Sequence, residues 1–134
     1  MYKVFTKLVG NLFVPGGQEL LKDLKSGQQL DLVRESDNQY DKNAIRVEAN
    51  GNKIGYLGAH VARELAPRID AEEMELYCYV AQITGGGDKN YGCNLILTDE
   101  EVNVDATGEI ISSNTRPTND PKDGTKEGSG AMQI

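Results

Sequence analysis

A polar loop between two apolar, strand-like stretches carries the residues of this chain that could do chemistry. The loop reads Asp37-Asn38-Gln39-Tyr40-Asp41-Lys42-Asn43. Carboxylate and amide oxygens accept hydrogen bonds, amide nitrogens donate them, and a tyrosine ring offers a flat face for stacking. Such a loop can hold a nucleotide, and no other stretch of the sequence offers a comparable set of groups.

The same residues also have a purely structural explanation. Asx side chains bond their own backbone, so Asn38, Asp41 and Asn43 could simply build a turn. Asp41 could pair with Arg34 or Arg46 as a scaffold ion pair. We favour the structural explanation for Asn43, because the chain must enter a strand there, and residue types alone leave both explanations open for the other two.

The net charge of the chain is −7 over 134 residues, and it is unevenly distributed. Residues 1–98 hold 13 acidic and 11 basic side chains, whereas residues 99–134 hold 8 and 3. An acidic protein repels nucleic acid at long range, which argues against a non-specific DNA coat. We expect one domain over residues 1–98 and an acidic, largely disordered tail over 99–134. From about Ser112 onward, the tail has too few apolar residues to bury the surface that would offset the entropy cost of ordering it.

No stretch of 18 apolar residues predicts a membrane span, and the first residues contain no signal-peptide block. The expected location is therefore cytoplasmic. In a reducing compartment Cys78 and Cys93 are expected to be buried thiols. These two cysteines and His60 are too scattered to form a zinc site, so we expect no metal and no cofactor.

Alternating apolar residues predict a mainly β chain of about six strands. A single main helix is expected over 60–69, where Val61, Leu65 and Ile69 recur at four-residue spacing. Without alternating strands and helices, this pattern favours a small barrel or sandwich. The expected strands are Lys3–Val9, Gln29–Glu35, Ala44–Ala49, Lys53–Leu57, Met74–Ile83 and Cys93–Leu97, with hairpin turns at Asn50-Gly51-Asn52 and Gly85-Gly86-Gly87 and a short helix or irregular crossing over 18–24.

Residues 37–47, the Asn-Gly turn, the stretch Ile54-Gly55-Tyr56-Leu57 and the helix together resemble the HIRAN domain. The resemblance extends from about Val4 to Leu97. This module occurs in fork-remodelling helicases and as a stand-alone bacterial or phage protein. No Gly-rich loop ending in Lys-Ser/Thr accompanies it here, so the motor is absent from the sequence.

The resemblance implies an OB-like barrel that captures the 3′-OH end of single-stranded DNA, with DNA repair as the setting. Asp41 would accept a hydrogen bond from the 3′-hydroxyl, Tyr40 would border that pocket, and Asn38 would donate to a phosphate. This likeness tips the interpretation of Asn38 and Asp41 toward function. The remaining DNA-binding candidates are Phe13, Tyr56, His60 and Tyr91.

These remaining candidates also have plainer explanations. Tyr40 and Tyr56 could be half-buried packing aromatics, and Phe13 could belong to the core. His60 could be an ordinary surface residue, whereas Tyr91, next to a Gly-rich tip, is the better candidate for an exposed stacking ring.

The chain departs from the family pattern at two phosphate-binding cations. Leu12 and Ala59 stand where the family has an arginine and a lysine, although His60 lies next to the second position. Fewer phosphate contacts predict a modest affinity. The candidate replacements are Arg34, Lys42, Arg63, Arg68 and Lys89.

Two other functions remain open at this stage. The first is a protein-interaction adaptor that uses the barrel and the acidic tail without binding DNA. The second is a hydrolase acting on acid anhydrides, which we disfavour because no nucleophile–base pair is visible. The candidate protein partners are a helicase, a nuclease or another repair protein.

Overall fold

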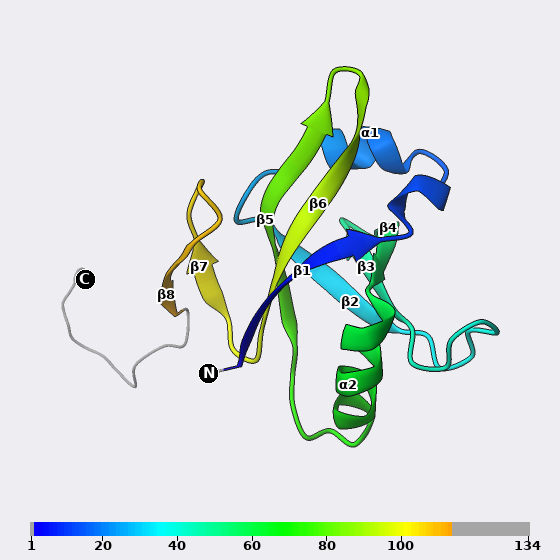
Figure 1. Ribbon diagram of the computed structural model, residues 1–134. Helices are drawn as coiled ribbons and strands as arrows, with labels where there is room; N and C mark the ends of the chain where they lie inside the picture. The colour runs from blue at the N-terminus through cyan, green and yellow to red at the C-terminus, as the bar shows by residue number, and fades with distance from the viewer. Residues whose placement is uncertain (1, 114–134) are drawn as a thin grey trace, which may run out of the picture.

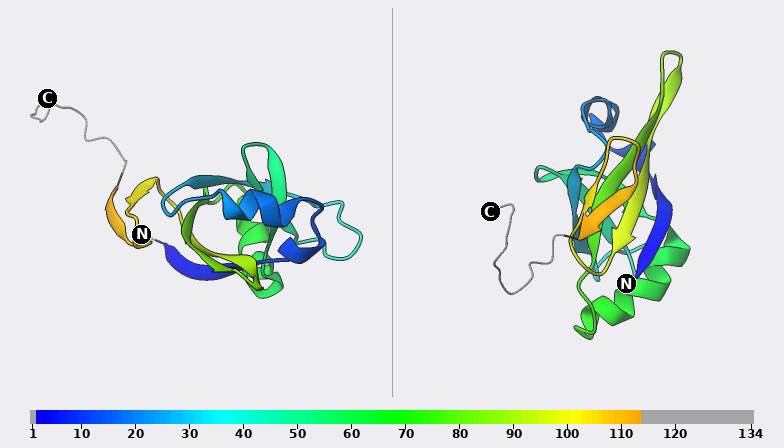
Figure 2. Two further views of the ribbon diagram at one scale, coloured as in Figure 1. Left: turned by 90° about the horizontal axis from the view of Figure 1, so that it is seen from above. Right: turned by 90° about the vertical axis from the view of Figure 1, so that its left-hand side faces the viewer.

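The computed structural model describes residues 2–113, in which six antiparallel strands close into a barrel in the order β1-β4-β3-β2-β5-β6 (Figure 1). Viewed from above, the strands surround one interior (Figure 2). This arrangement confirms the predicted mainly β, OB-like barrel with one main helix. The elements are β1 (Lys3–Val9), the 3-10 turn η1 (Asn11–Phe13), α1 (Gly17–Lys22), β2 (Gln29–Arg34), β3 (Ile45–Ala49), β4 (Asn52–Leu57), α2 (Ala59–Asp70), β5 (Tyr77–Gly86), β6 (Lys89–Thr98), β7 (Val102–Val104) and β8 (Ile110–Ser113).

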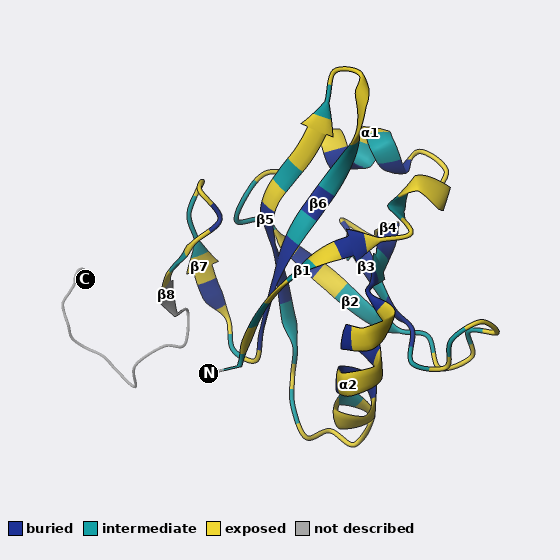
Figure 3. Cartoon of the chain, in the orientation of Figure 1, coloured by how far each residue is buried: buried dark blue, intermediate teal, exposed yellow. Residues whose placement is uncertain are grey.

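Apolar residues alternate with more polar ones along the strands, and the apolar set forms the core inside the barrel. On β3 the alternate residues Ile45, Val47 and Ala49 are buried, while their neighbours are partly exposed. Strand β1 closes the barrel because it pairs with β4 through Leu8 opposite Leu57, and with β6 along most of its length. Figure 3 shows this buried interior in dark blue.

The two α-helices lie at opposite ends of the barrel (Figure 1). Helix α2 contributes its apolar face, including Val61 and Leu65, to the core, as its four-residue spacing predicts. Helix α1 is shorter and buries Leu21 completely. None of the described helices is long and apolar enough to cross a membrane.

Both predicted hairpin turns are present. Asn50 and Gly51 have φ values of 52° and 83°, which suit a two-residue turn between β3 and β4. At the tip of β5 and β6 only glycine fits position 85, because a Cβ there would lie 2.0 Å from the Asn90 carbonyl oxygen. The hairpin extends farther toward its tip than expected, since β5 continues to Gly86 and β6 already begins at Lys89, whereas β5 begins at Tyr77 rather than at Met74.

Two further strands, β7 and β8, form a hairpin that the sequence analysis did not predict. It lies over the outer face of β5 and β6 (Figure 2, right). Val102 is buried there against Tyr79 and Ile96, and its N–H donates to the Tyr79 hydroxyl at 3.0 Å. Strand β8 includes Ser112, where the sequence analysis placed the start of a disordered tail. The expected disorder of 114–134 lies outside the described residues.

Cys78 and Cys93 are free thiols and are buried, as predicted, and they lie on the neighbouring strands β5 and β6. They are not opposite one another, because Cys78 pairs with Leu97 and Cys93 with Ile83. Burial raises the pKa of the Cys93 thiol to about 12, so both cysteines serve as small core residues.

Candidate nucleic-acid interface

The loop between β2 and β3 is held in shape by its own Asx side chains. Asn38 Oδ1 accepts hydrogen bonds from the backbone N–H groups of Tyr40 at 2.8 Å and Asp41 at 3.0 Å. Asp41 Oδ1 accepts from the N–H of Asn43 at 2.9 Å. The turn-building explanation therefore holds for Asn38 and Asp41. It does not use up Asp41, because no described residue donates a hydrogen bond to its second carboxylate oxygen.

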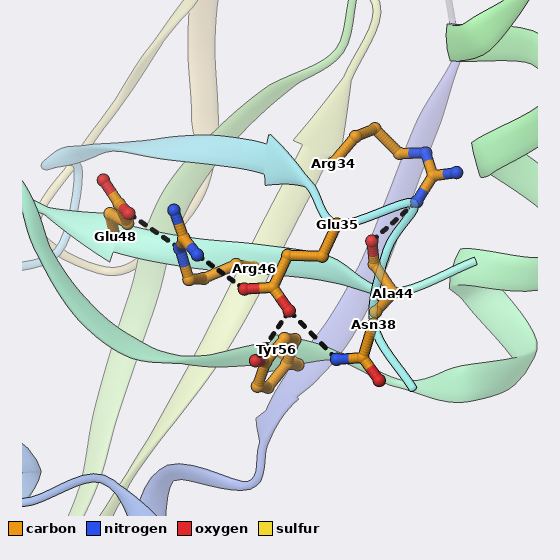
Figure 4. Close-up of polar contacts among 7 residues, drawn as sticks. All are labelled: Arg34, Glu35, Asn38, Ala44, Arg46, Glu48 and Tyr56. Carbon is orange, nitrogen blue, oxygen red and sulfur yellow. Dashed lines mark hydrogen bonds and ion pairs between the residues drawn. The ribbon is translucent and has the colours of Figure 1, made fainter. Parts of the chain in front are cut away.

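Glu35 connects this loop to the barrel wall (Figure 4). Its carboxylate accepts hydrogen bonds from the Asn38 amide at 2.9 Å and the Tyr56 hydroxyl at 2.9 Å, and it forms an ion pair with Arg46. Burial raises the pKa of Glu35, but these hydrogen bonds and the charge of Arg46 together outweigh burial and lower it below its usual value. Glu35 is therefore an ionised anchor for Asn38 and Tyr56.

Arg34 fixes the other end of the loop. Its guanidinium donates to the carbonyl oxygens of Ala44 at 2.8 Å and Lys42 at 3.0 Å, and it pairs with Asp70 at the end of α2. The hydrogen bond to Asp70 raises the pKa of Arg34. The alternative in which Asp41 forms an ion pair with Arg34 or Arg46 does not hold among the described residues, because both guanidinium groups pair with other carboxylates.

An open, mainly apolar cleft of about 400 Å³ lies where this loop meets β4 and the start of α2. Three of the predicted residues that line it come from the loop, and Tyr56 comes from β4. The lining residues are Val9, Asn38, Tyr40, Asp41, Ala44, Lys53, Tyr56, Leu57 and Ala59. The cleft thus combines an apolar surface, two tyrosines, a carboxylate and an ammonium group.

The two tyrosines of the cleft differ in exposure. Tyr40 is 90 % exposed, so the half-buried packing role considered for it is wrong. It lines both the cleft and a second, more polar hollow of about 440 Å³ beside it. Tyr56 is half-buried and fixed by Glu35, with its ring against Gly10. Tyr40 therefore offers a free ring, and Tyr56 a fixed one.

Lys53 is a cleft residue that the sequence analysis missed. Its ammonium nitrogen lies 4.6 Å from the centroid of the Tyr56 ring. Strict alternation would place residues 53 and 56 on opposite faces of a strand. Ile54 is an extra residue in β4, since Lys53 pairs with Glu48 while Gly55 pairs with Val47. This bulge brings Lys53 and Tyr56 to the same face.

The other predicted residues lie outside the lining of the cleft. Phe13 is 89 % exposed in η1, so the core role considered for it is wrong. His60 is exposed and follows Ala59. Tyr91 is partly buried against the core and its ring lies beside Gly86, so it is less free than expected. The Gln18 side chain accepts a hydrogen bond from the Tyr91 N–H at 2.7 Å and donates one to the Tyr91 carbonyl oxygen at 3.0 Å.

Comparison with known proteins gives one family. The family model of the HIRAN domain matches residues 1–98. The crystal structure of the HIRAN domain of human HLTF is 26% identical, with a TM-score of 0.56 over 71% of this chain and 72% of that chain. A crystal structure of a Lactobacillus plantarum protein is 28% identical, with a TM-score of 0.56 over 72% and 96% of the two chains. No protein of curated function matches.

Proposed function

Since this chain belongs to the HIRAN domain family, we propose that it is a nucleic-acid-binding module that captures the 3′-hydroxyl end of single-stranded DNA without catalysis. The observation that carries this proposal is the cleft in which Asn38, Tyr40, Asp41 and Tyr56 meet. The cleft offers a group for each part of a strand end: the Asp41 carboxylate for the hydroxyl, the tyrosine rings for the bases and the Lys53 ammonium group for a phosphate.

Asp41 is the residue to which we assign end selectivity. One of its oxygens is held by the Asn43 N–H, which leaves the other oxygen to accept a hydrogen bond from a terminal hydroxyl. A carboxylate repels a phosphate at the same position. The cleft would therefore accept a free 3′-OH and reject both a 3′-phosphate and a continuing strand.

Tyr40 and Tyr56 are the residues to which we assign base stacking. Stacking on an aromatic ring contributes about 1–3 kcal/mol per base and tolerates any base sequence. Phe13, with its exposed ring, would extend the stacking surface for bases farther from the end. His60 would lie near the backbone of the strand. We assign no stacking to Tyr91, because its ring packs against the core.

The test is fluorescence anisotropy with a 5′-labelled single strand that ends in either a 3′-hydroxyl or a 3′-phosphate. The wild-type protein should prefer the hydroxyl, and Asp41→Asn should lose most of that preference, because an amide no longer repels the phosphate. Asp37→Asn is the matched control, since Asp37 is in the same loop but does not line the cleft. Equal binding of both ends by the wild-type protein would refute end capture.

A further inference from the structure

Another hollow, larger than the cleft and the polar hollow beside it at about 680 Å³, lies between β2, the end of α2 and the loop that leads into β5. In Figure 3 this loop joins the lower end of α2 to β5. The hollow shares no lining residue with the cleft, so both could be occupied at once. We call it the acidic groove, because four carboxylates are among the residues that line it.

Apolar side chains form the floor of the acidic groove. Leu32, Ile69, Met74 and Leu76 all line it, and all are partly buried side chains that pack against the core. The part of each side chain that remains exposed is therefore apolar, and its position is fixed by packing against the core. The volume lies within the range of about 300–1,000 Å³ that is usual for ligand sites.

Carboxylates form the rim of the acidic groove, from Glu72, Glu73, Glu75 and Asp99. None of the four forms an ion pair with a described residue. Arg34, the cation in the lining, is committed to Asp70 and so leaves the rim charge uncompensated. Such a rim repels a polyanion and attracts a cation.

The distribution of this charge indicates the kind of cation. Within residues 2–113 no group of three or more His, Cys, Asp or Glu side chains is arranged to hold a metal ion. The rim carboxylates therefore do not converge on one bound ion, which suits several separate cations on one chain. Lysine and arginine also cover apolar surface with their aliphatic stems.

We propose that the acidic groove docks a basic, amphipathic segment of a partner protein. An aliphatic or aromatic side chain of the segment rests on the floor, and its lysine or arginine side chains meet the rim carboxylates. Residues 114–134 of this chain complement the rim less well, because they contain three basic and three acidic side chains. This inference goes beyond the DNA-binding proposal and does not depend on it.

The test measures binding of a fluorescein-labelled peptide of repeating Leu-Lys-Lys units to the full chain by anisotropy. The rim variant is Glu72→Gln/Glu73→Gln/Glu75→Gln/Asp99→Asn. The control variant neutralises four exposed carboxylates elsewhere, Glu19→Gln/Asp23→Asn/Asp31→Asn/Asp88→Asn. Both variants change the net charge from −7 to −3, so they are matched in charge and differ in where it is lost. The control also gives up the exposed ion pair of Glu19 with Lys22, and the rim variant gives up the charge that accepts from the Tyr77 hydroxyl and the Tyr2 N–H.

We expect the Kd to rise about tenfold or more in the rim variant and less than about twofold in the control. Met74→Lys, which puts a cation on the floor, should also weaken binding, and so should serine in place of leucine in the peptide. Equal weakening by the rim and control variants would overturn the proposal, because net charge alone would then explain binding. Failure of the wild-type protein to bind the peptide would overturn it as well.

Two further measurements distinguish a partner segment from two alternative occupants of the acidic groove, the C-terminal residues of this chain and single-stranded DNA. Arg116→Gln/Lys122→Gln/Lys126→Gln should leave peptide affinity unchanged, whereas tighter binding would show that this chain fills its own groove and would overturn the assignment to a partner. An unlabelled single strand with a 3′-hydroxyl should not displace the peptide. Displacement would contradict a surface separate from the DNA cleft.

Discussion

Lys53 is the cation best placed to serve the cleft. It lines the cleft and lies over the ring of Tyr56, whereas Leu12 and Ala59, the positions at which the resemblance led us to expect family cations, carry no charge. We expect Lys53 to contact a phosphate of the bound strand. Lys53→Gln should therefore weaken binding and reduce the slope of log affinity against log salt by about 0.7.

The matched control for Lys53 is Lys25→Gln. Lys25 is an exposed lysine between α1 and β2, and it does not line the cleft. Titrations at several salt concentrations give both slopes. The same change of slope in both variants would mean that only overall charge matters, and no change for Lys53 would remove it from the interface.

Glu35 supports the cleft through stability rather than through contact with DNA. In Glu35→Gln the remaining carbonyl oxygen can still accept from the Asn38 amide and the Tyr56 hydroxyl, but the charge that pairs with Arg46 is lost, which leaves Arg46 with Glu48 alone. We expect Glu35→Gln to lower the free energy of unfolding by about 1–3 kcal/mol at neutral pH. Urea unfolding measures this loss, and Glu73→Gln, an exposed carboxylate without an ion pair to a described residue, should change little.

The pKa of Glu35 also gives this loss a pH dependence. Because its pKa in the folded protein is below the ordinary 4.5, its stabilisation is fully present above that value and disappears as the pH falls through the lowered pKa. The difference in stability between wild type and Glu35→Gln should therefore shrink under acidic conditions. A difference that stays constant down to the lowest accessible pH would contradict the anchoring role of the ionised carboxylate.

The loop residues of the cleft could be predicted from the sequence, whereas Lys53 on β4, which lines the same cleft, could not. Asn38, Tyr40 and Asp41 are neighbours along the chain, so one short stretch displays their combined chemistry. Lys53 reaches the same cleft only through the bulge at Ile54, and a bulge has no clear signature in a single sequence. The exposure of Phe13 was likewise hidden, because a short 3-10 turn breaks the alternation that indicates burial.

At the scale of elements, the hairpin of β7 and β8 is held against the barrel by apolar packing and by a buried hydrogen bond to Tyr79. Tyr79→Phe removes the hydroxyl that accepts from the Val102 N–H and leaves that buried donor unpaired. The expected cost is about 1–3 kcal/mol in the free energy of unfolding. The matched control is Tyr77→Phe, because the Tyr77 hydroxyl bonds Glu75 at an exposed position. Equal effects of the two substitutions would show that the hydrogen bond between Val102 and Tyr79 adds no stability.

The hairpin of β7 and β8 was also the part of the fold that could not be predicted from the sequence. The barrel strands and α2 were predictable because each has an apolar face at the period of its own structure. Strand β7 is three residues long, and the segment around it is rich in carboxylates, so its short apolar pattern resembled that of a tail. Only the three-dimensional structure shows that Tyr79 and Ile96 leave an outer face for Val102 to cover.

At the scale of the whole molecule, the negative charge should reduce the affinity for DNA wherever the carboxylates lie. The rim variant and the control variant both bring the net charge from −7 to −3 without altering the cleft. We expect both variants to bind the labelled single strand more tightly than wild type at about 10 mM salt, where charges act over about 30 Å. At about 0.15 M salt that range falls to about 8 Å, and the three affinities should converge. Tighter binding that persists at the higher salt would mean that the substituted carboxylates lie beside the bound strand, and the position of the interface would then need revision.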